Sequence, residues 1–240
     1  GVKCVPIDLE NGDFSSIPKD FDYVLHLGVF RAAGDDFDLD FRSNAEGTGL
    51  LMSHCRSAKA FLACSTSGVY QSVGRNLLTE TSGLGDNHRA MLPTYSITKI
   101  AVEAVVRFAA REFNLPTIIP RLCVPYGANG GWPYYHLLAM KHGQAIPVNP
   151  DKPSIYSLIH EDDIIASIPK LLQAASVPAN IVNWGGDETV SLEEWATFLG
   201  ELTGVEPRFH YTHEGTLESV MVDTKKLFSI TGPFKDAIGK

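Results

Sequence analysis

The sequence predicts an α/β fold in which helices cover both faces of a parallel sheet. Short runs of β-branched and other apolar residues recur along the chain, and they are apolar nearly throughout, as strands buried on both faces are. Helix-length segments separate these runs, and strands that alternate with helices are typical of a parallel sheet. The predicted strands are 2–7 (VKCVPI), 23–28 (YVLHLG), 60–65 (AFLACS), 117–124 (TIIPRLCV) and 180–184 (NIVNW), and the predicted helices are 39–57, 93–113, 161–176 and 191–203.

Two of the predicted helices begin with recognisable capping residues. Ser191 and Glu194, in the stretch SLEE, have the spacing of a capping box. In the stretch IHEDDI, His160, Asp162 and Asp163 stand where a strand passes into the helix 161–176, and carboxylates suit the positive end of a helix. We interpret both groups as structural.

One segment, 126–153, interrupts the alternation of strands and helices. It is rich in glycine, proline and aromatic residues and follows a predicted strand. In α/β proteins, loops at the carboxyl ends of strands commonly contact the substrate. The composition fits a substrate loop and a plain surface excursion equally well.

Composition and charge exclude several classes of function. The chain has 240 residues, enough for one large domain or two closely joined ones, and its formal net charge is −8. Lysines and arginines are scattered, so no basic face for nucleic acid or an anionic membrane is expected. No apolar run approaches the roughly 20 residues that span a bilayer. Because the opening residues also lack the pattern of a signal peptide, we expect a soluble, cytoplasmic protein.

The cysteines and histidines show no pattern of metal ligands. Four widely spaced cysteines, Cys4, Cys55, Cys64 and Cys123, contain no CxxC pair, and the eight histidines include no HxxxH or HExxH pattern. We therefore expect reduced core cysteines and no metal site.

A tyrosine and a lysine four residues apart are candidates for proton transfer. Tyr95 and Lys99, in PTYSITKIAVE, fall on one face of a predicted helix. Moving a hydride to or from a carbinol carbon requires a proton to move at its oxygen. A free tyrosine has a pKa of about 10, and a nearby ammonium lowers that pKa. The alternative is that Tyr95 is an ordinary core-edge residue and Lys99 a solvated surface residue.

Three further stretches, in order along the chain, give the pair a context. They are RSNAEGTGLL (42–51), CSTSGVY (64–70) and IHEDDI (159–164). Together with YSITK they resemble the extended short-chain dehydrogenase/reductase family, which includes NAD-dependent epimerases and dehydratases. The resemblance extends from about residue 2 to about residue 230 and implies a doubly wound, Rossmann-like parallel sheet with a small C-terminal α/β substrate lobe.

The resemblance assigns roles to individual residues. It implies that Tyr95 is the acid/base, that Lys99 lowers its pKa and binds the cofactor ribose, and that Thr66 orients the substrate oxygen. For Asn44 the competing interpretation is a bond to local backbone. The implied cofactor is NAD or NADP, contacted by Asp8, Leu9, Leu27, Gly28, Val29, Asn44, Ser65, Tyr95, Lys99, Leu122, Cys123 and Val124, and the implied substrate contacts are Ser67, Val124, Trp132 and Tyr156.

The sequence departs from the family at its start. It contains no GxxGxxG phosphate loop and begins at what corresponds to the family's third strand, so the sheet is expected to be incomplete in its N-terminal half. We expect the sequence to be part of a protein with about 60 further residues before Gly1. The predicted division is a dinucleotide-binding part, 1–128 and 152–184, and a substrate-binding lobe, 129–151 and 185–240.

A second departure concerns the substrate. Val124 and Tyr156 stand where sugar-nucleotide enzymes of the family carry an Asn and an Arg near the substrate's phosphates. With aromatic residues Trp132, Tyr134 and Tyr135 nearby, a less charged substrate is expected. The sequence thus predicts an NAD(P)-dependent oxidoreductase acting on a carbonyl or alcohol. The alternatives are a nucleotide-sugar epimerase or dehydratase and a non-catalytic dinucleotide-binding relative. A homodimer through the helices that carry Asn44 and Tyr95 is a further expectation.

Overall fold

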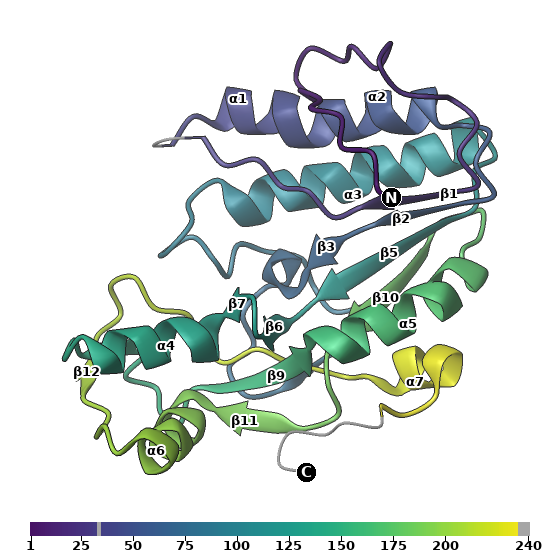
Figure 1. The fold of residues 1–240 in the computed structure, drawn as a ribbon. Helices are drawn as coiled ribbons and strands as arrows, with labels where there is room; N and C mark the ends of the chain where they lie inside the picture. Colours follow the sequence, from purple (N-terminus) through teal and green to yellow (C-terminus); the bar gives the residue numbers. More distant parts are fainter. Residues whose placement is uncertain (33–34, 235–240) are drawn as a thin grey trace.

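The computed structural model describes residues 1–32 and 35–234, and its centre is a parallel sheet (Figure 1). The strands β1 (Tyr23–His26), β2 (Ala60–Ala63), β5 (Thr117–Leu122) and β10 (Asn180–Trp184) are neighbours in that order, and short β3 (Ser65–Thr66) also pairs with β5. Every pairing in this sheet is parallel. The predicted α/β class and four of the predicted strands are confirmed.

Helices cover both faces of this sheet, as the unbroken apolar strands require. On one face lie α1 (Phe37–Asp40), the π-helix η1 (Phe41–Glu46), α2 (Gly47–His54) and α3 (Tyr95–Glu112), with α2 packed beside α3 (Figure 1). On the other face lie α5 (Glu161–Gln173) and α7 (Lys225–Thr231), which contact each other. All four residues of β2 are buried between these layers.

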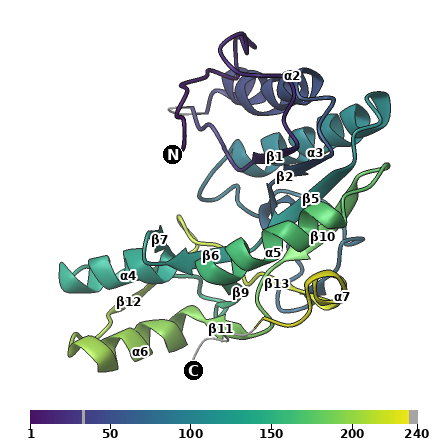
Figure 2. The same cartoon turned by 45° about the vertical axis from the view of Figure 1, so that its right-hand side comes forward.

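A second sheet lies beyond the carboxyl ends of the first. It contains β6 (Val124–Gly127), β7 (Gly130–Gly131), β9 (Ile155–His160) and β11 (Thr189–Ser191) in the order β11-β9-β6-β7. Next to it, α4 (Trp132–Lys141) packs against α6 (Leu192–Thr203) (Figure 2). The strand β8 (Ile146–Val148) pairs with β12 (Phe209–Tyr211). Segment 126–153 is therefore largely folded into a helix and strands rather than an extended loop.

Short pieces and caps complete the frame around the site. The 3₁₀ helix η2 (Ser67–Val69) follows β3, and β4 (Leu77–Leu78) pairs with β13 (Met221–Val222). The predicted capping box is confirmed, since Ser191 Oγ accepts from Glu194 N while the Glu194 carboxylate accepts from Ser191 N. His160 caps α5 through its side chain, which accepts from Asp162 N.

The prediction of a strand over 2–7 is wrong. These residues have no regular structure, and β1 pairs only with β2 among the described residues. A strand is stable only with a ladder partner for its backbone groups, and none lies beside 2–7. Tyr23 and Leu25 lie on one face of this edge strand, and they are 55% and 43% exposed because no helix of the described chain covers that face. The predicted helix 39–57 also differs, because the π-helical turn η1 interrupts its first half.

Two further observations concern the whole described chain. Across residues 1–32 and 35–234, no helix has both the length and the apolar character needed to cross a membrane. All four cysteines are free thiols, but Cys4 is exposed rather than a core residue. Of the predicted substrate lobe 185–240, residues 235–240 lie outside the described part.

Candidate active site

The candidate site is a cavity of about 340 Å³ at the carboxyl ends of the central strands. Ligands in open α/β sheets bind at this edge, because the loops that follow parallel strands converge there. Twelve of the residues predicted from the sequence line it: Leu27, Val29, Ser65, Thr66, Ser67, Tyr95, Lys99, Leu122, Cys123, Val124, Trp132 and Tyr156. The structure therefore brings the predicted catalytic trio and most of its predicted neighbours together.

Thr66 is the last residue of β3 and the N-cap of η2. Its Oγ1 accepts a hydrogen bond of 3.0 Å from Gly68 N, which fixes the side chain at the base of the cavity. Accepting this bond leaves the hydroxyl hydrogen available for donation to another group. The hydroxyl acts on the Tyr95 phenol, whose pKa it lowers.

Tyr95 is the first residue of α3, so its side chain lies at the end of the helix that faces the cavity. Burial raises the pKa of the Tyr95 phenol, and the Thr66 hydroxyl and the charge of Arg31 oppose this rise. The neutral phenol is the stable form at pH 7.

Lys99 lies one helical turn after Tyr95 and is buried, with 6% of its surface exposed. Its Nζ donates a hydrogen bond of 3.0 Å to the carbonyl of Cys64, at the end of β2. Burial lowers the pKa of Lys99, and the negative charge of Glu103 opposes that lowering. An ammonium has three donors, so two remain for a ligand in the cavity.

A buried ion pair supports this region from behind. Arg121 on β5 donates to Glu103 on α3 at 2.9 Å and 2.7 Å, with both side chains less than 5% exposed. Ser65 Oγ donates to the same carboxylate at 2.5 Å. Burial alone would lower the pKa of Arg121, but its hydrogen bonds with Glu103 raise it above the ordinary value. The pair joins α3 to β3 and β5 directly beside Thr66 and Lys99.

Asn44 positions a loop and does not line the cavity. Its amide bonds both backbone groups of Phe30, accepting from N at 2.8 Å and donating to O at 3.0 Å, and also donates to Asp40 O. Asp40 in turn accepts from Ala32 N at 2.8 Å and from Thr94 Oγ1 at 2.5 Å. These bonds hold the loop after β1, so the structure supports the backbone-bonding interpretation of Asn44.

Three other predicted contacts do not line the cavity. Asp8 is exposed and accepts from Glu10 N in a local turn. Leu9 packs against Gly47 in α2, and Gly28 lies between two cavity residues without lining it. The physical reason is that 1–8 does not continue the sheet, so Asp8 and Leu9 are not carried to its carboxyl edge.

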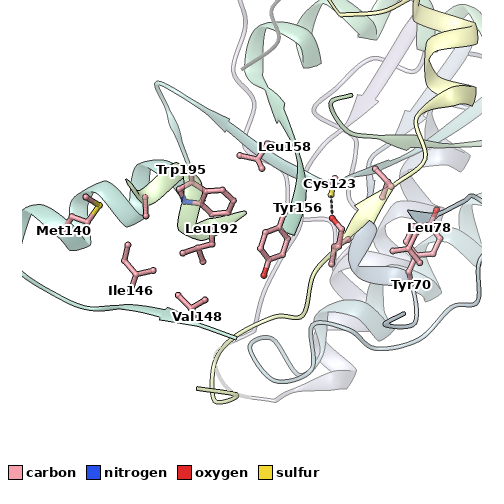
Figure 3. Close-up of a cluster of buried hydrophobic side chains, with 13 residues drawn as sticks. Tyr70, Leu78, Cys123, Met140, Ile146, Val148, Tyr156, Leu158, Leu192 and Trp195 are labelled. Atoms are coloured by element: carbon pink, nitrogen blue, oxygen red, sulfur yellow. Dashed lines mark hydrogen bonds between the residues drawn. The ribbon is translucent and has the colours of Figure 1, made fainter. Parts of the chain in front are cut away.

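The far wall of the cavity is aromatic. Trp132 and Tyr156 meet edge to face with ring centroids 5.2 Å apart, and the Tyr156 hydroxyl donates to Leu217 O at 2.9 Å. Figure 3 shows Tyr156 beside Trp195 in a cluster of buried hydrophobic side chains. A second cavity of about 240 Å³ adjoins the first and shares this wall. The residues common to both cavities are Met91, Trp132, Tyr156 and Leu217.

Several lining residues were not predicted. His88, Met91 and Leu92 precede α3 in a turn, and Leu217 and Val220 come from the C-terminal part of the chain. The turn has no periodic pattern that would mark it. The feature of the sequence that could have indicated these lining residues is the polar pair Asn87 and His88, shortly before Tyr95.

Comparisons with known proteins agree with this architecture. A model of the NAD dependent epimerase/dehydratase family matches residues 4–185. The low-salt glycan biosynthesis protein Agl12 of Haloferax volcanii is 25% identical over an alignment of 183 residues, and the match covers 72% of this chain. The match spans 56% of the length of that curated relative.

Solved structures show the same fold. MoeE5 in complex with UDP-glucuronic acid and NAD aligns with a TM-score of 0.81 at 22% identity, covering 97% of this chain and 80% of that one. DesIV, a dTDP-glucose 4,6-dehydratase from Streptomyces venezuelae with NAD and TYD bound, aligns with a TM-score of 0.79 at 20% identity, covering 97% and 74%. At these identities the likeness shows the fold alone.

Proposed function

Because this chain belongs to the NAD dependent epimerase/dehydratase family, we propose that it oxidises or reduces a carbinol carbon with NAD as the cofactor and Tyr95 as the acid/base. The observation that carries the proposal is the convergence of Thr66, Tyr95 and Lys99 on one cavity at the carboxyl edge of the sheet. A spacing of four residues alone would not bring all three together.

The residues at this edge fit the nicotinamide half of the cofactor. Leu27 and Val29 present apolar side chains that are 52% and 47% exposed, which suits the face of a flat ring. Lys99 has two free donors for ribose hydroxyls. The sequence contains no glycine-rich loop for the pyrophosphate, so this proposal assigns residues only to the nicotinamide and its ribose.

The side chains divide the proton chemistry between them. When bound, the nicotinamide supplies or removes a hydride at the reacting carbon. In the reducing direction Tyr95 gives its phenolic proton to the carbonyl oxygen, and in the oxidising direction the phenolate takes that proton back. Thr66 donates its hydroxyl hydrogen to the same oxygen, while its Oγ1 accepts from Gly68 N.

We propose a substrate with little negative charge. Among the described residues that line the two cavities, Lys99 is the only lysine or arginine. A diphosphate needs charge-assisted hydrogen bonds, which a single ammonium beside the nicotinamide site does not supply. The aromatic wall of Trp132 and Tyr156 suits a partly apolar body instead.

A nucleotide-sugar epimerase or dehydratase is the second candidate. The family match and the solved structures with UDP-sugars or a dTDP-glucose enzyme favour it. These enzymes would use the same Thr66 and Tyr95 chemistry on a larger substrate.

A substrate screen separates the two candidates. The protein is incubated with NAD and, in parallel, with secondary alcohols and with UDP-glucose and dTDP-glucose, while NADH absorbance and sugar products are recorded. Net NADH formation with an alcohol supports the oxidoreductase. Conversion of a nucleotide sugar without net NADH formation supports the second candidate and contradicts the first.

We also propose that the chain pairs with a second copy in the cytoplasm. The helices α2 and α3 pack together, and their outer surface exposes Leu50, Ile97 and Phe108, the last by 65%. Two such surfaces would form a four-helix contact. Light scattering tests this: a dimer in the wild type that becomes a monomer in Phe108→Glu supports it, and a wild-type monomer contradicts it.

A further inference from the structure

His88 lies in the wall of the active-site cavity, beside the acid/base. Its ring centroid is 5.5 Å from that of Tyr95, and the two rings are tilted by 40°. The imidazole also lies directly over Gly68, where a Cβ atom would meet Nδ1 at 2.8 Å and Cε1 at 2.9 Å. Only glycine at position 68 lets the ring approach the turn that holds Thr66 this closely.

The neighbouring Asn87 fixes which nitrogen of His88 carries the hydrogen. Asn87 Nδ2 donates to Ser67 O at 3.2 Å, so its Oδ1 is the atom that faces His88 Nδ1. An amide oxygen only accepts, and Nδ1 must therefore donate. Burial lowers the pKa of His88 to about 4, so the ring is neutral at pH 7 and Nε2 carries a lone pair.

Nε2 is available to a ligand. Within the described part of the chain, no protein group forms a hydrogen bond with Nε2. Nε2 is also not one of the fully buried side-chain atoms without a partner, so it is accessible to other molecules. His88 lines the same cavity that Thr66 and Tyr95 line. The mechanism described above does not use it.

We propose that His88 is a further substrate-binding residue, whose Nε2 accepts a hydrogen bond from a second hydroxyl group of the substrate, next to the hydroxyl that reacts. The proposal rests on the proposed function and narrows its substrate class to vicinal diols and their hydroxyketones. Thr66 and Tyr95 hold the reacting oxygen while His88 holds its neighbour, and two points of attachment determine which carbon is presented for hydride transfer. One neutral hydrogen bond corresponds to about a 3- to 10-fold change in Kd.

Nitrogen-15 NMR of the full chain tests the assignment without any turnover. The probes are cis-1,2-cyclohexanediol and cyclohexanol, which differ by one hydroxyl. We expect the free protein to show the Nδ1–H tautomer of His88, and the Nε2 resonance to shift with the diol and stay in place with cyclohexanol. An Nε2–H tautomer, no response to the diol, or an equal response to both probes would overturn the proposal.

Two variants add a matched comparison. His88→Phe keeps a ring against Tyr95 and removes the acceptor, whereas His88→Gln keeps an acceptor oxygen. We expect the Phe variant to bind the diol about 3- to 10-fold more weakly with cyclohexanol binding unchanged, and the Gln variant to retain part of the preference. A Phe variant that prefers the diol as strongly as the wild type would refute the role. If a variant fails to fold, the wild-type titration still decides.

The outcome is separable from that of the proposed function. A chain that binds the diol through Nε2 but turns over no substrate fails as an oxidoreductase and retains this site. A chain that oxidises simple alcohols with an unresponsive Nε2 keeps its function and loses this site.

Discussion

Replacing Glu103 by alanine should destabilise the protein by about 3–5 kcal/mol, because it leaves Arg121 charged, buried and without its partner. The structure sets this magnitude. Both side chains of the pair are less than 5% exposed, and two hydrogen bonds of 2.9 Å and 2.7 Å join them. The substitution also removes the acceptor of Ser65 Oγ. Such a loss is a large fraction of the roughly 5–15 kcal/mol by which domains are stable.

A surface ion pair provides the control. Lys59 Nζ lies 2.8 Å from Asp22 Oδ1, but these side chains are 67% and 70% exposed. Lys59→Ala should therefore cost less than about 1 kcal/mol. Urea unfolding followed by circular dichroism measures both variants. If Glu103→Ala lost no more than Lys59→Ala, the reasoning from burial would be refuted.

Two further predictions follow from the described contacts. Asn44→Ala should raise the hydrogen-exchange rate of the Phe30 amide at least about 10-fold, because that amide loses its 2.8 Å acceptor; an unchanged rate would remove Asn44 as the clamp of this loop. Burial lowers the pKa of His26, His88 and His136 to about 4 each, below the unfolded value of about 6.5. The free energy of unfolding is therefore at its full value above pH 6.5 and falls as the pH drops toward 4, because the unfolded state then binds protons that the folded state does not. The expected loss is about 1–2 kcal/mol for each histidine between pH 7 and 5. Urea midpoints that stay constant over this range would contradict it.

Much of the fold was predictable because the central strands are covered on both faces. The apolar runs of β2 and β5 carry that signal directly, and the capping box of α6 is confined to four consecutive residues. The run 2–7 has the same apolar character, yet its backbone has no neighbouring strand. The helix α4 was missed because WPYYHLLAMK follows a glycine-rich stretch, and its aromatic residues resembled those of a substrate loop.

The site was predictable only in part, because some of its residues lie on regular helices and strands and others lie in irregular turns. Thr66, Tyr95 and Lys99 lie on regular elements, whose order and spacing fix where their side chains meet. His88 lies in an irregular turn, and its place depends on tertiary contact with Gly68. For Asn44 the sequence permits a ligand contact and a backbone contact alike, and the position of Phe30 decides between them.

The acid/base role of Tyr95 is the central claim, and the turnover of Tyr95→Phe tests it most directly. The variant keeps the ring beside His88 and Thr66 and removes only the hydroxyl. With a substrate identified by the screen, we expect turnover to fall at least about 100-fold, in line with general acid/base catalysis, while NAD binding measured by calorimetry stays within a few-fold. Turnover equal to that of the wild type would contradict the assignment of Tyr95.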